Sequence, residues 1–211
     1  MRRTKQDAEK TKQAILDSAM SIFCEKGYSK TTFDEIAKRI NLTKGAVYWY
    51  FRNKPDIVAA LINEFAGIYL QHIKSFLEQR QDITFDRITE MQLQVNRLLR
   101  EDEKFHQFMF FITCQMEWSE AILNKIIPTI NQTKTITRDL FANALSELKT
   151  HGKMRKNVDI EMICDILMVT YGGALNAYFT RNLSNDFDEV IKTSYNLIFN
   201  NIKTEDSTDE N

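Results

Sequence analysis

The chain has 211 residues, 43% of them hydrophobic and 27% charged, a balance typical of a soluble globular protein with one or two domains. Its 2 prolines and 6 glycines supply little turn chemistry, which argues against a fold of β-hairpins and favours long helices. The net charge of −1 divides unevenly: residues 1–56 carry +5 and the remainder −6, so the basic N-terminal segment predicts an anionic partner, either nucleic acid or a membrane surface.

The first predicted helix runs from about Lys10 to Lys26. One apolar face recurs at helical spacing and comprises Ile15, Ala19, Ile22 and Phe23. Gly27 is expected to end this helix, because glycine adopts the left-handed conformation of a C-terminal cap without steric cost.

Two short helices are predicted next, and each begins at a residue whose side chain can cap it. The second begins with a capping box, in which Thr32 and Glu35 bond reciprocally through side chain and backbone. Asn41 follows it and tolerates the left-handed region. Thr43 then caps a third helix that reaches about Tyr50. The short connection predicts a helix-turn-helix.

The remainder also has a helical pattern. Asn53 is expected to cap a fourth helix that has Pro55 in its first turn and continues to about Arg80. Further helices are predicted near residues 84–101, 104–118, 120–151, 158–181 and 185–203. Pro128 should kink or split the third of these. The fold class is therefore all-α, with a three-helix helix-turn-helix domain over residues 1–54, a larger helical domain over 55–203 and a disordered acidic tail over 204–211.

The third helix has the chemistry of a DNA-reading surface. Its N-terminus attracts phosphate, Gly45 lets DNA approach the backbone, and Lys44 reaches a guanine edge or a phosphate. Tyrosine hydroxyls on this helix suit phosphate oxygens. The predicted DNA-binding residues are Thr32, Thr43, Lys44, Gly45, Tyr48, Tyr50 and Lys54. A merely solvated charged surface is the alternative, but clustered tyrosines argue against it. Trp49 is expected to pack at the junction with the fourth helix rather than stack on a base.

The segment from about Thr11 to Leu61 resembles the DNA-binding domain of the TetR/AcrR family of bacterial repressors. The resemblance rests on ILDSAMSIFCEKGY at 15–28 and TTFDEIAKRINLTKGAVYWYFRNK at 31–54. Asn41 stands where many members have glycine, and Tyr50 where histidine is common. The resemblance implies an all-helical homodimer that binds an operator in double-stranded DNA. Its last two long helices would form the dimer interface, and its central helices would enclose a pocket for a small-molecule effector.

Residues 105–118, FHQFMFFITCQMEW, are apolar on most faces, which predicts a buried helix. Core packing is the simpler interpretation of each side chain. The mixture of methionine, aromatic rings and isolated polar groups also suits a pocket for a flat or amphipathic ligand. The predicted effector-binding residues are Tyr69, Phe108, Phe111, Gln115 and Trp118.

Two adjacent glycines, Gly172 and Gly173, interrupt an apolar helix predicted over Met162–Tyr178. They favour close helix approach at a dimer interface, with a local kink as the alternative. A stripe in the last helix suits pairing with this helix and comprises Ile191, Tyr195, Ile198 and Ile202.

Other functions lack support in the sequence. The three histidines have no partner at metal-ligand spacing, and no catalytic or nucleotide-binding motif is found, so we expect no metal, no cofactor and no enzyme activity. Cys24, Cys114 and Cys164 are expected to be buried thiols of a reduced compartment. The N-terminus has no apolar signal-peptide core, and the uncharged stretch Ile166–Thr180 has 15 residues, whereas a membrane span needs roughly 20. We therefore expect a cytoplasmic protein without membrane contact.

The sequence thus predicts a ligand-responsive repressor that binds a palindromic operator as a homodimer and is released by a hydrophobic or amphipathic effector. One alternative is a DNA-binding regulator without an effector. A second, from another class, is a module that uses its basic N-terminus to bind an anionic membrane or another protein.

Overall fold

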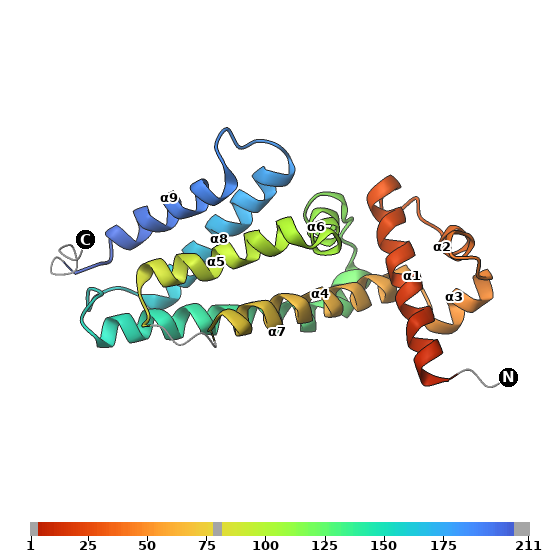
Figure 1. Cartoon of the computed structure of the whole chain (residues 1–211), viewed down its shortest axis with the longest axis horizontal. Coiled ribbons are helices and arrows are strands. Elements are labelled where there is room, and N and C mark those ends of the chain that lie inside the picture. The colour runs from red at the N-terminus through yellow and green to blue at the C-terminus, as the bar shows by residue number, and fades with distance from the viewer. Residues whose placement is uncertain (1–3, 78–81, 205–211) are drawn as a thin grey trace. The chain divides into compact units, whose positions relative to one another are not determined.

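The computed structural model describes residues 4–77 and 82–204, which contain nine α-helices, one π-helical segment and no β-strand (Figure 1). The helices are α1 (Lys5–Lys26), α2 (Phe33–Arg39), α3 (Lys44–Tyr50), α4 (Lys54–Leu77), α5 (Phe85–Glu101), α6 (Glu103–Phe110), η1 (the π-helix Phe111–Gln115), α7 (Glu120–Thr150), α8 (Ile160–Phe179) and α9 (Phe187–Asn200). The all-α prediction is confirmed. The predicted end of the fourth helix at Arg80 and the expected tail beyond Thr204 lie outside the described residues.

The predicted caps of the first three helices are present. Gly27 ends α1 at a φ of +87°. Thr32 and Glu35 form the capping box of α2, and Asn41 has a φ of +54° in the turn that follows. The Thr43 hydroxyl accepts the Ala46 N–H at 3.2 Å and starts α3. These short-range bonds fix the helix-turn-helix locally.

Two expected helix boundaries are wrong. The first helix begins at Lys5, not near Lys10, because Thr4 and Asp7 form a further capping box in which the Asp7 N–H donates to the Thr4 hydroxyl at 3.2 Å. The α-helix expected over 104–118 ends at Phe110. The π-helix η1 follows it directly and ends at Gln115. In contrast, Pro128 lies inside a continuous α7, so this helix is not split there.

The chain forms two compact units, which are described separately. Unit 1 comprises residues up to Ile68 together with Asp102–Asn131, and unit 2 comprises Tyr69–Glu101 together with the residues from Gln132 onward. The start of α4 and the segment from α6 to the first part of α7 thus belong to the same unit as the helix-turn-helix. The sequence placed the functional division earlier in the chain, after residue 54.

Stacked aromatic rings form the core of unit 1. Phe23 of α1 stacks on Phe111 of η1, with ring centroids 5.0 Å apart. Phe65 of α4 stacks on Phe108 of α6 at 4.3 Å and also contacts Phe105. This core holds α1 against the segment that follows α5, and so fixes the base of the helix-turn-helix.

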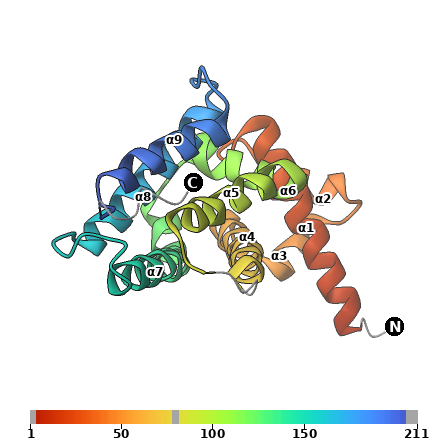
Figure 2. The ribbon, with the colours of Figure 1, turned by 60° about the vertical axis from the view of Figure 1, so that its left-hand side comes forward.

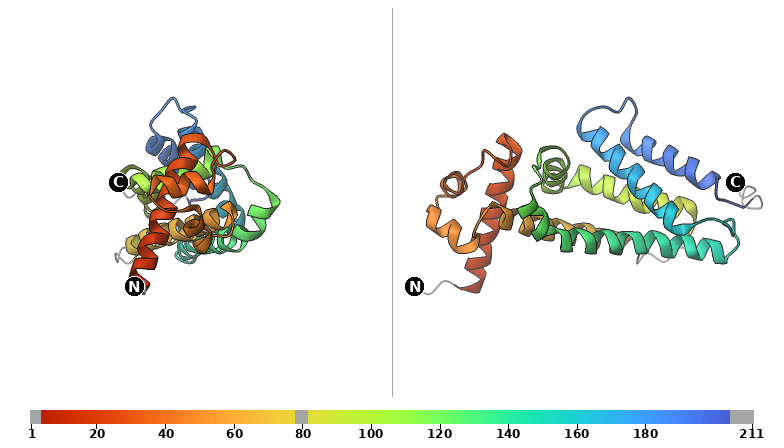
Figure 3. Two further views of the ribbon diagram at one scale, coloured as in Figure 1. Left: turned by 90° about the vertical axis from the view of Figure 1, so that its right-hand side faces the viewer. Right: turned by 180° about the vertical axis from the view of Figure 1, so that it is seen from behind.

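In unit 2, α8 and α9 lie side by side and α9 also packs on α5 (Figures 2 and 3). The buried hydroxyl of Tyr195 on α9 donates to the Leu167 carbonyl of α8 at 3.2 Å. Most of the apolar stripe expected on the last helix is thus used within the chain, since Ile191, Tyr195 and Ile202 are buried.

Candidate nucleic-acid interface

The third helix of the motif, α3, is anchored by one narrow apolar seam. Val47 is fully buried and Phe51, at the C-terminal cap, is 4% exposed. Thr43, Lys44 and Gly45 are exposed at the start of α3. A seven-residue helix has little stability of its own, so this seam and the contacts with α2 hold it in place.

Tyr48 lies between the core and the solvent. Its ring contacts Phe33 of α2 with centroids 4.8 Å apart, while half of the residue stays exposed. The Lys44 ammonium is 5.7 Å from the centroid of the same ring. Tyr48 and Lys44 therefore share one exposed face of α3.

Trp49 does not pack at the junction with α4, so this expectation is wrong. It is 74% exposed, and its ring meets Tyr50 edge-on with centroids 4.6 Å apart. The reason is geometric: Trp49 follows the buried Val47 by two residues, which on an α-helix turns its side chain about 200° away from the core. The sequence already contained this signal.

Two predicted DNA contacts have other partners or surroundings in the structure. The Tyr50 hydroxyl oxygen is buried without a hydrogen-bond partner among the described residues, so it is not presented to solvent. Thr32 is exposed, but its backbone N–H and hydroxyl both donate to the Glu35 carboxylate, at 2.9 and 2.7 Å.

Lys54 also differs from a free surface lysine. Its ammonium donates to the carbonyl oxygens of Tyr28 at 2.7 Å and Ser29 at 3.0 Å, and lies 4.4 Å from the Tyr28 ring centroid. Partial burial lowers its pKa from the ordinary value, because desolvation penalises the charged form. The side chain thus joins the start of α4 to the turn after α1.

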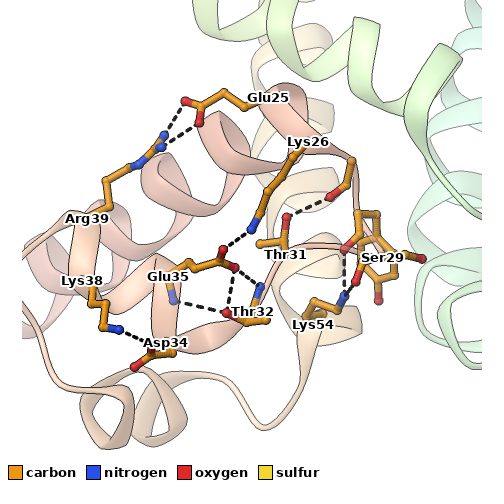
Figure 4. Close-up of polar contacts among 12 residues, drawn as sticks. Glu25, Lys26, Ser29, Thr31, Thr32, Asp34, Glu35, Lys38, Arg39 and Lys54 are labelled. Carbon is orange, nitrogen blue, oxygen red and sulfur yellow. Dashed lines mark hydrogen bonds and ion pairs between the residues drawn. The ribbon is translucent and has the colours of Figure 1, made fainter.

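Several cations around α2 are paired with carboxylates (Figure 4). Arg39 binds Glu25 of α1 through both terminal guanidinium nitrogens, one of them at 2.6 Å, and this lowers the pKa of Glu25 to about 2. Lys26 pairs with Glu35 and has the same effect on its pKa. By contrast, Lys44 has no acidic partner in the described part of the chain. Its positive charge is therefore not neutralised by any of the residues that the structure describes.

The five predicted effector-binding residues have different surroundings. Phe108 and Phe111 are buried in the unit 1 core described above. Gln115 donates from Nε2 to the Cys24 carbonyl at 3.1 Å, and its Oε1 is buried without a partner among the described residues. Trp118 is 44% exposed. Tyr69 belongs to unit 2, where its hydroxyl accepts a bond from Thr137 at 3.1 Å.

The sequence reasoning missed a buried polar network in unit 2. Asn96 of α5 is fully buried; it donates to Asp188 of α9 at 2.7 Å and accepts from the Tyr171 hydroxyl of α8 at 3.0 Å. Burial strongly raises the pKa of Tyr171, to which the Gln92 side chain is also hydrogen-bonded. The signal was available, because Gln92 and Asn96 are four residues apart and so share one face of an amphipathic helix.

The remaining expectations concern metals, thiols and the membrane. Within residues 4–77 and 82–204, no group of three histidine, cysteine or acidic side chains could hold a metal ion. Cys114 is exposed, which corrects the expectation that all three cysteines are buried. Helix α8 is long and apolar enough to span a membrane by length and composition, with a mean hydropathy of 1.2. Only 22% of its most apolar stretch is buried in the protein. One such helix is weak evidence for a span, so its exposed apolar face needs an explanation within the protein's function.

The geometry of α2, the turn and α3 defines a helix-turn-helix protein of the DNA-binding class. Residues 15–61 match the family described as bacterial regulatory proteins, tetR family. The N-terminal part of the chain therefore has the DNA-binding segment of this family of transcriptional regulators.

Similar proteins are regulators of this kind. The chain is 45% identical to the HTH-type transcriptional regulator AcrR of Shigella flexneri over 60 residues, which span 28% of each chain. It is 28% identical to the HTH-type transcriptional repressor BepR of Brucella suis biovar 1 (strain 1330) over 187 residues, 84% of this chain and 85% of BepR. The fold is similar to that of SmeT, the repressor of the Stenotrophomonas maltophilia multidrug efflux pump SmeDEF, with a TM-score of 0.73, 21% identity, and 92% and 91% of the chains covered. A SmeT–triclosan complex gives a TM-score of 0.75 at 22% identity, with 92% of each chain covered.

Proposed function

We propose that the chain is a ligand-responsive transcriptional repressor that binds a palindromic DNA operator as a homodimer. The observation that carries the proposal is α3, a short helix with a buried seam and an exposed face of an unpaired lysine and aromatic side chains. A helix of this kind reads base edges in the major groove and contacts the flanking phosphates.

The proposed DNA-reading surface consists of Thr43, Lys44, Gly45, Tyr48 and Trp49. The first three lie in the first turn, where the backbone N–H groups attract phosphate. Gly45 leaves the backbone accessible, because a Cβ at this position would meet only the Thr43 hydroxyl, at 3.9 Å. Trp49 adds an exposed apolar surface suited to a thymine methyl group or a sugar.

Thr32 and Tyr50 are also proposed to contact phosphates, although their donor groups are less available than those of the surface described above. Thr32 is exposed at the start of α2, although its donors are engaged with Glu35. Tyr50 would have to turn its covered hydroxyl outward before it could bind a phosphate oxygen.

Self-association is supported by an exposed apolar patch on unit 2. The patch comprises Met162, Ile166 and Val169 of α8 and Leu197 of α9, which are 56%, 39%, 75% and 63% exposed. Gly172 and Gly173 are exposed on the same helix, and a Cβ added at either would meet nothing within 4 Å. A second copy covering this surface would bury the patch and explain the glycines as sites of close helix approach.

A palindromic operator follows from such a dimer. Two copies of α3 would enter successive major grooves about 34 Å apart, and a two-fold symmetric protein matches a two-fold symmetric site. Because the operator lies on the chromosome, the proposed place of action is the bacterial cytoplasm.

The effector is proposed to be a small hydrophobic or amphipathic molecule bound by the domain of residues 55–203. SmeT, whose fold is similar, forms a complex with triclosan, which is small and largely apolar. Of the contacts predicted from the sequence, Phe108, Phe111, Gln115 and Trp118 lie in unit 1 and are the candidates for one site. Tyr69 lies in unit 2 and is a separate candidate. A coupling free energy of about 1–3 kcal/mol between effector and operator binding would reduce operator occupancy by a factor between several-fold and about a hundred-fold.

A regulator without an effector is the second candidate. It is favoured by the packing of Phe108 and Phe111, whose rings stack on Phe65 and Phe23 and so serve the core of unit 1. Insensitivity of the operator complex to every ligand that the protein binds would select this alternative.

The proposal is tested by selecting duplexes from a random DNA library with the purified full chain. We expect a two-fold symmetric motif for the wild type. Lys44→Ala should weaken binding to it by about tenfold or more, because one base or phosphate contact is lost in each half-site. Lys156→Ala, which removes an exposed lysine of unit 2, is the matched control and should behave as wild type. Salt-sensitive binding without any enriched sequence would refute the proposal.

A further inference from the structure

The turn that follows α1, at Tyr28 and Ser29, is held from two sides. From the start of α4, the Lys54 ammonium donates to both carbonyl oxygens of this turn, at 2.7 and 3.0 Å (Figure 4). From the segment after η1, the Glu117 carboxylate accepts a hydrogen bond from the Ser29 hydroxyl. One short turn thus connects two parts of unit 1 that are about 60 residues apart in the sequence.

The charges of this cluster complement one another. Two carbonyl dipoles and the face of the Tyr28 ring surround the Lys54 ammonium, and partial burial opposes its charge. The nearby Glu117 carboxylate favours the charged form of this lysine. Since a lysine has three N–H donors and two are engaged with the turn, Lys54 is oriented toward the protein.

The segment Phe111–Glu117 contacts α1 at two further positions. The Phe111 ring stacks on Phe23, and Gln115 donates to the Cys24 carbonyl near the end of α1. Together with the bond between Glu117 and Ser29, these contacts follow the C-terminal end of α1 and the turn beyond it. The segment begins as a π-helix, a geometry that is frequent at functional sites.

We propose that Lys54 and Glu117 are positioning residues, which fix the turn after α1 so that α2 and α3 are held for DNA, and that the segment Phe111–Glu117 thereby controls operator affinity. This inference rests on the proposed DNA-binding function. It differs from the role predicted for Lys54 from the sequence, where the lysine binds a phosphate directly. The two roles predict opposite effects when Glu117 is removed.

The first test compares Glu117→Ala with Glu120→Ala on the operator obtained by selection. Both variants remove one exposed carboxylate of unit 1, and only Glu117 contacts the turn. We expect operator binding by Glu117→Ala to weaken by about tenfold, because each protomer of the dimer loses a hydrogen bond to a charged group. Glu120→Ala should bind as wild type. If Lys54 instead bound phosphate and Glu117 competed for it, Glu117→Ala would bind more tightly, and that result or an unchanged affinity would overturn the inference.

The second test separates positioning from phosphate contact by salt dependence. Log affinity falls as log salt rises, and loss of a phosphate contact makes this slope shallower by about 0.9 for each half-site. Lys54→Met should weaken binding and leave this slope unchanged, and a shallower slope would overturn the inference. If Lys54→Met fails to fold, as judged by circular dichroism, the exposed Glu117 variant still decides. Failure of the wild-type protein to select any operator would refute the proposed function itself.

Discussion

The buried network around Asn96 offers a quantitative test of unit 2. Replacement of Asn96 by leucine keeps the number and branching of the side-chain heavy atoms and removes both of its hydrogen bonds, to Asp188 and from Tyr171. Asp188 and Tyr171 differ in the hydrogen bonds that they retain in this variant. Asp188 keeps Arg100, at 3.0 Å, and is not fully buried, whereas the buried Tyr171 hydroxyl loses the acceptor of its proton.

The expected magnitude follows from this difference. An orphaned buried donor costs about 1–3 kcal/mol, and the lost bond to Asp188 adds about 1 kcal/mol. The apolar contacts of leucine offset part of this loss, which leaves Asn96→Leu about 2 kcal/mol less stable. Tyr171→Phe alone should cost about 1–2 kcal/mol, because the Asn96 oxygen then loses its donor and the Gln92 side chain loses a partner. The double variant has no orphaned hydroxyl and should be more stable than the sum of the single effects predicts, by about 1–2 kcal/mol.

The assay is urea unfolding of the four proteins, followed by circular dichroism. Protein concentration must be equal in all samples, because the apparent stability of a dimer depends on it. Single effects that add to within about 0.5 kcal/mol would show that Asn96 and Tyr171 act independently, and would refute the reasoning.

Two further predictions concern the dimer and acid stability. Val169→Asp should shift the protein to a monomer in sedimentation experiments, because the substitution would bury a carboxylate in the proposed interface; an unchanged mass would exclude Val169 from that interface. The low pKa values of Glu25 and Glu35, about 2 against an ordinary 4.5, stabilise the folded state above pH 4.5, and this stabilisation is lost as the pH falls from there toward 2. Arg39→Met should remove the contribution of Glu25 to this loss, so its unfolding midpoint should fall less between pH 6 and pH 3 than that of the wild type; equal decreases would contradict the assignment.

The sequence by itself determined the elements whose bonds are local. The capping box of Thr32, the left-handed residue Asn41 and the cap at Thr43 each involve groups within a few residues, so side-chain chemistry alone locates the helix-turn-helix. The outward direction of Trp49 was also determined at this level, since it follows from the spacing to Val47.

Only the tertiary structure decided the contacts between distant segments. The attachment of Lys54 to the Tyr28 and Ser29 carbonyls depends on backbone groups far away in the chain. No periodicity records which carbonyl a lysine will reach, because that choice follows from how the helices pack. The sequence therefore predicts the reading helix, while packing decides what holds it in position.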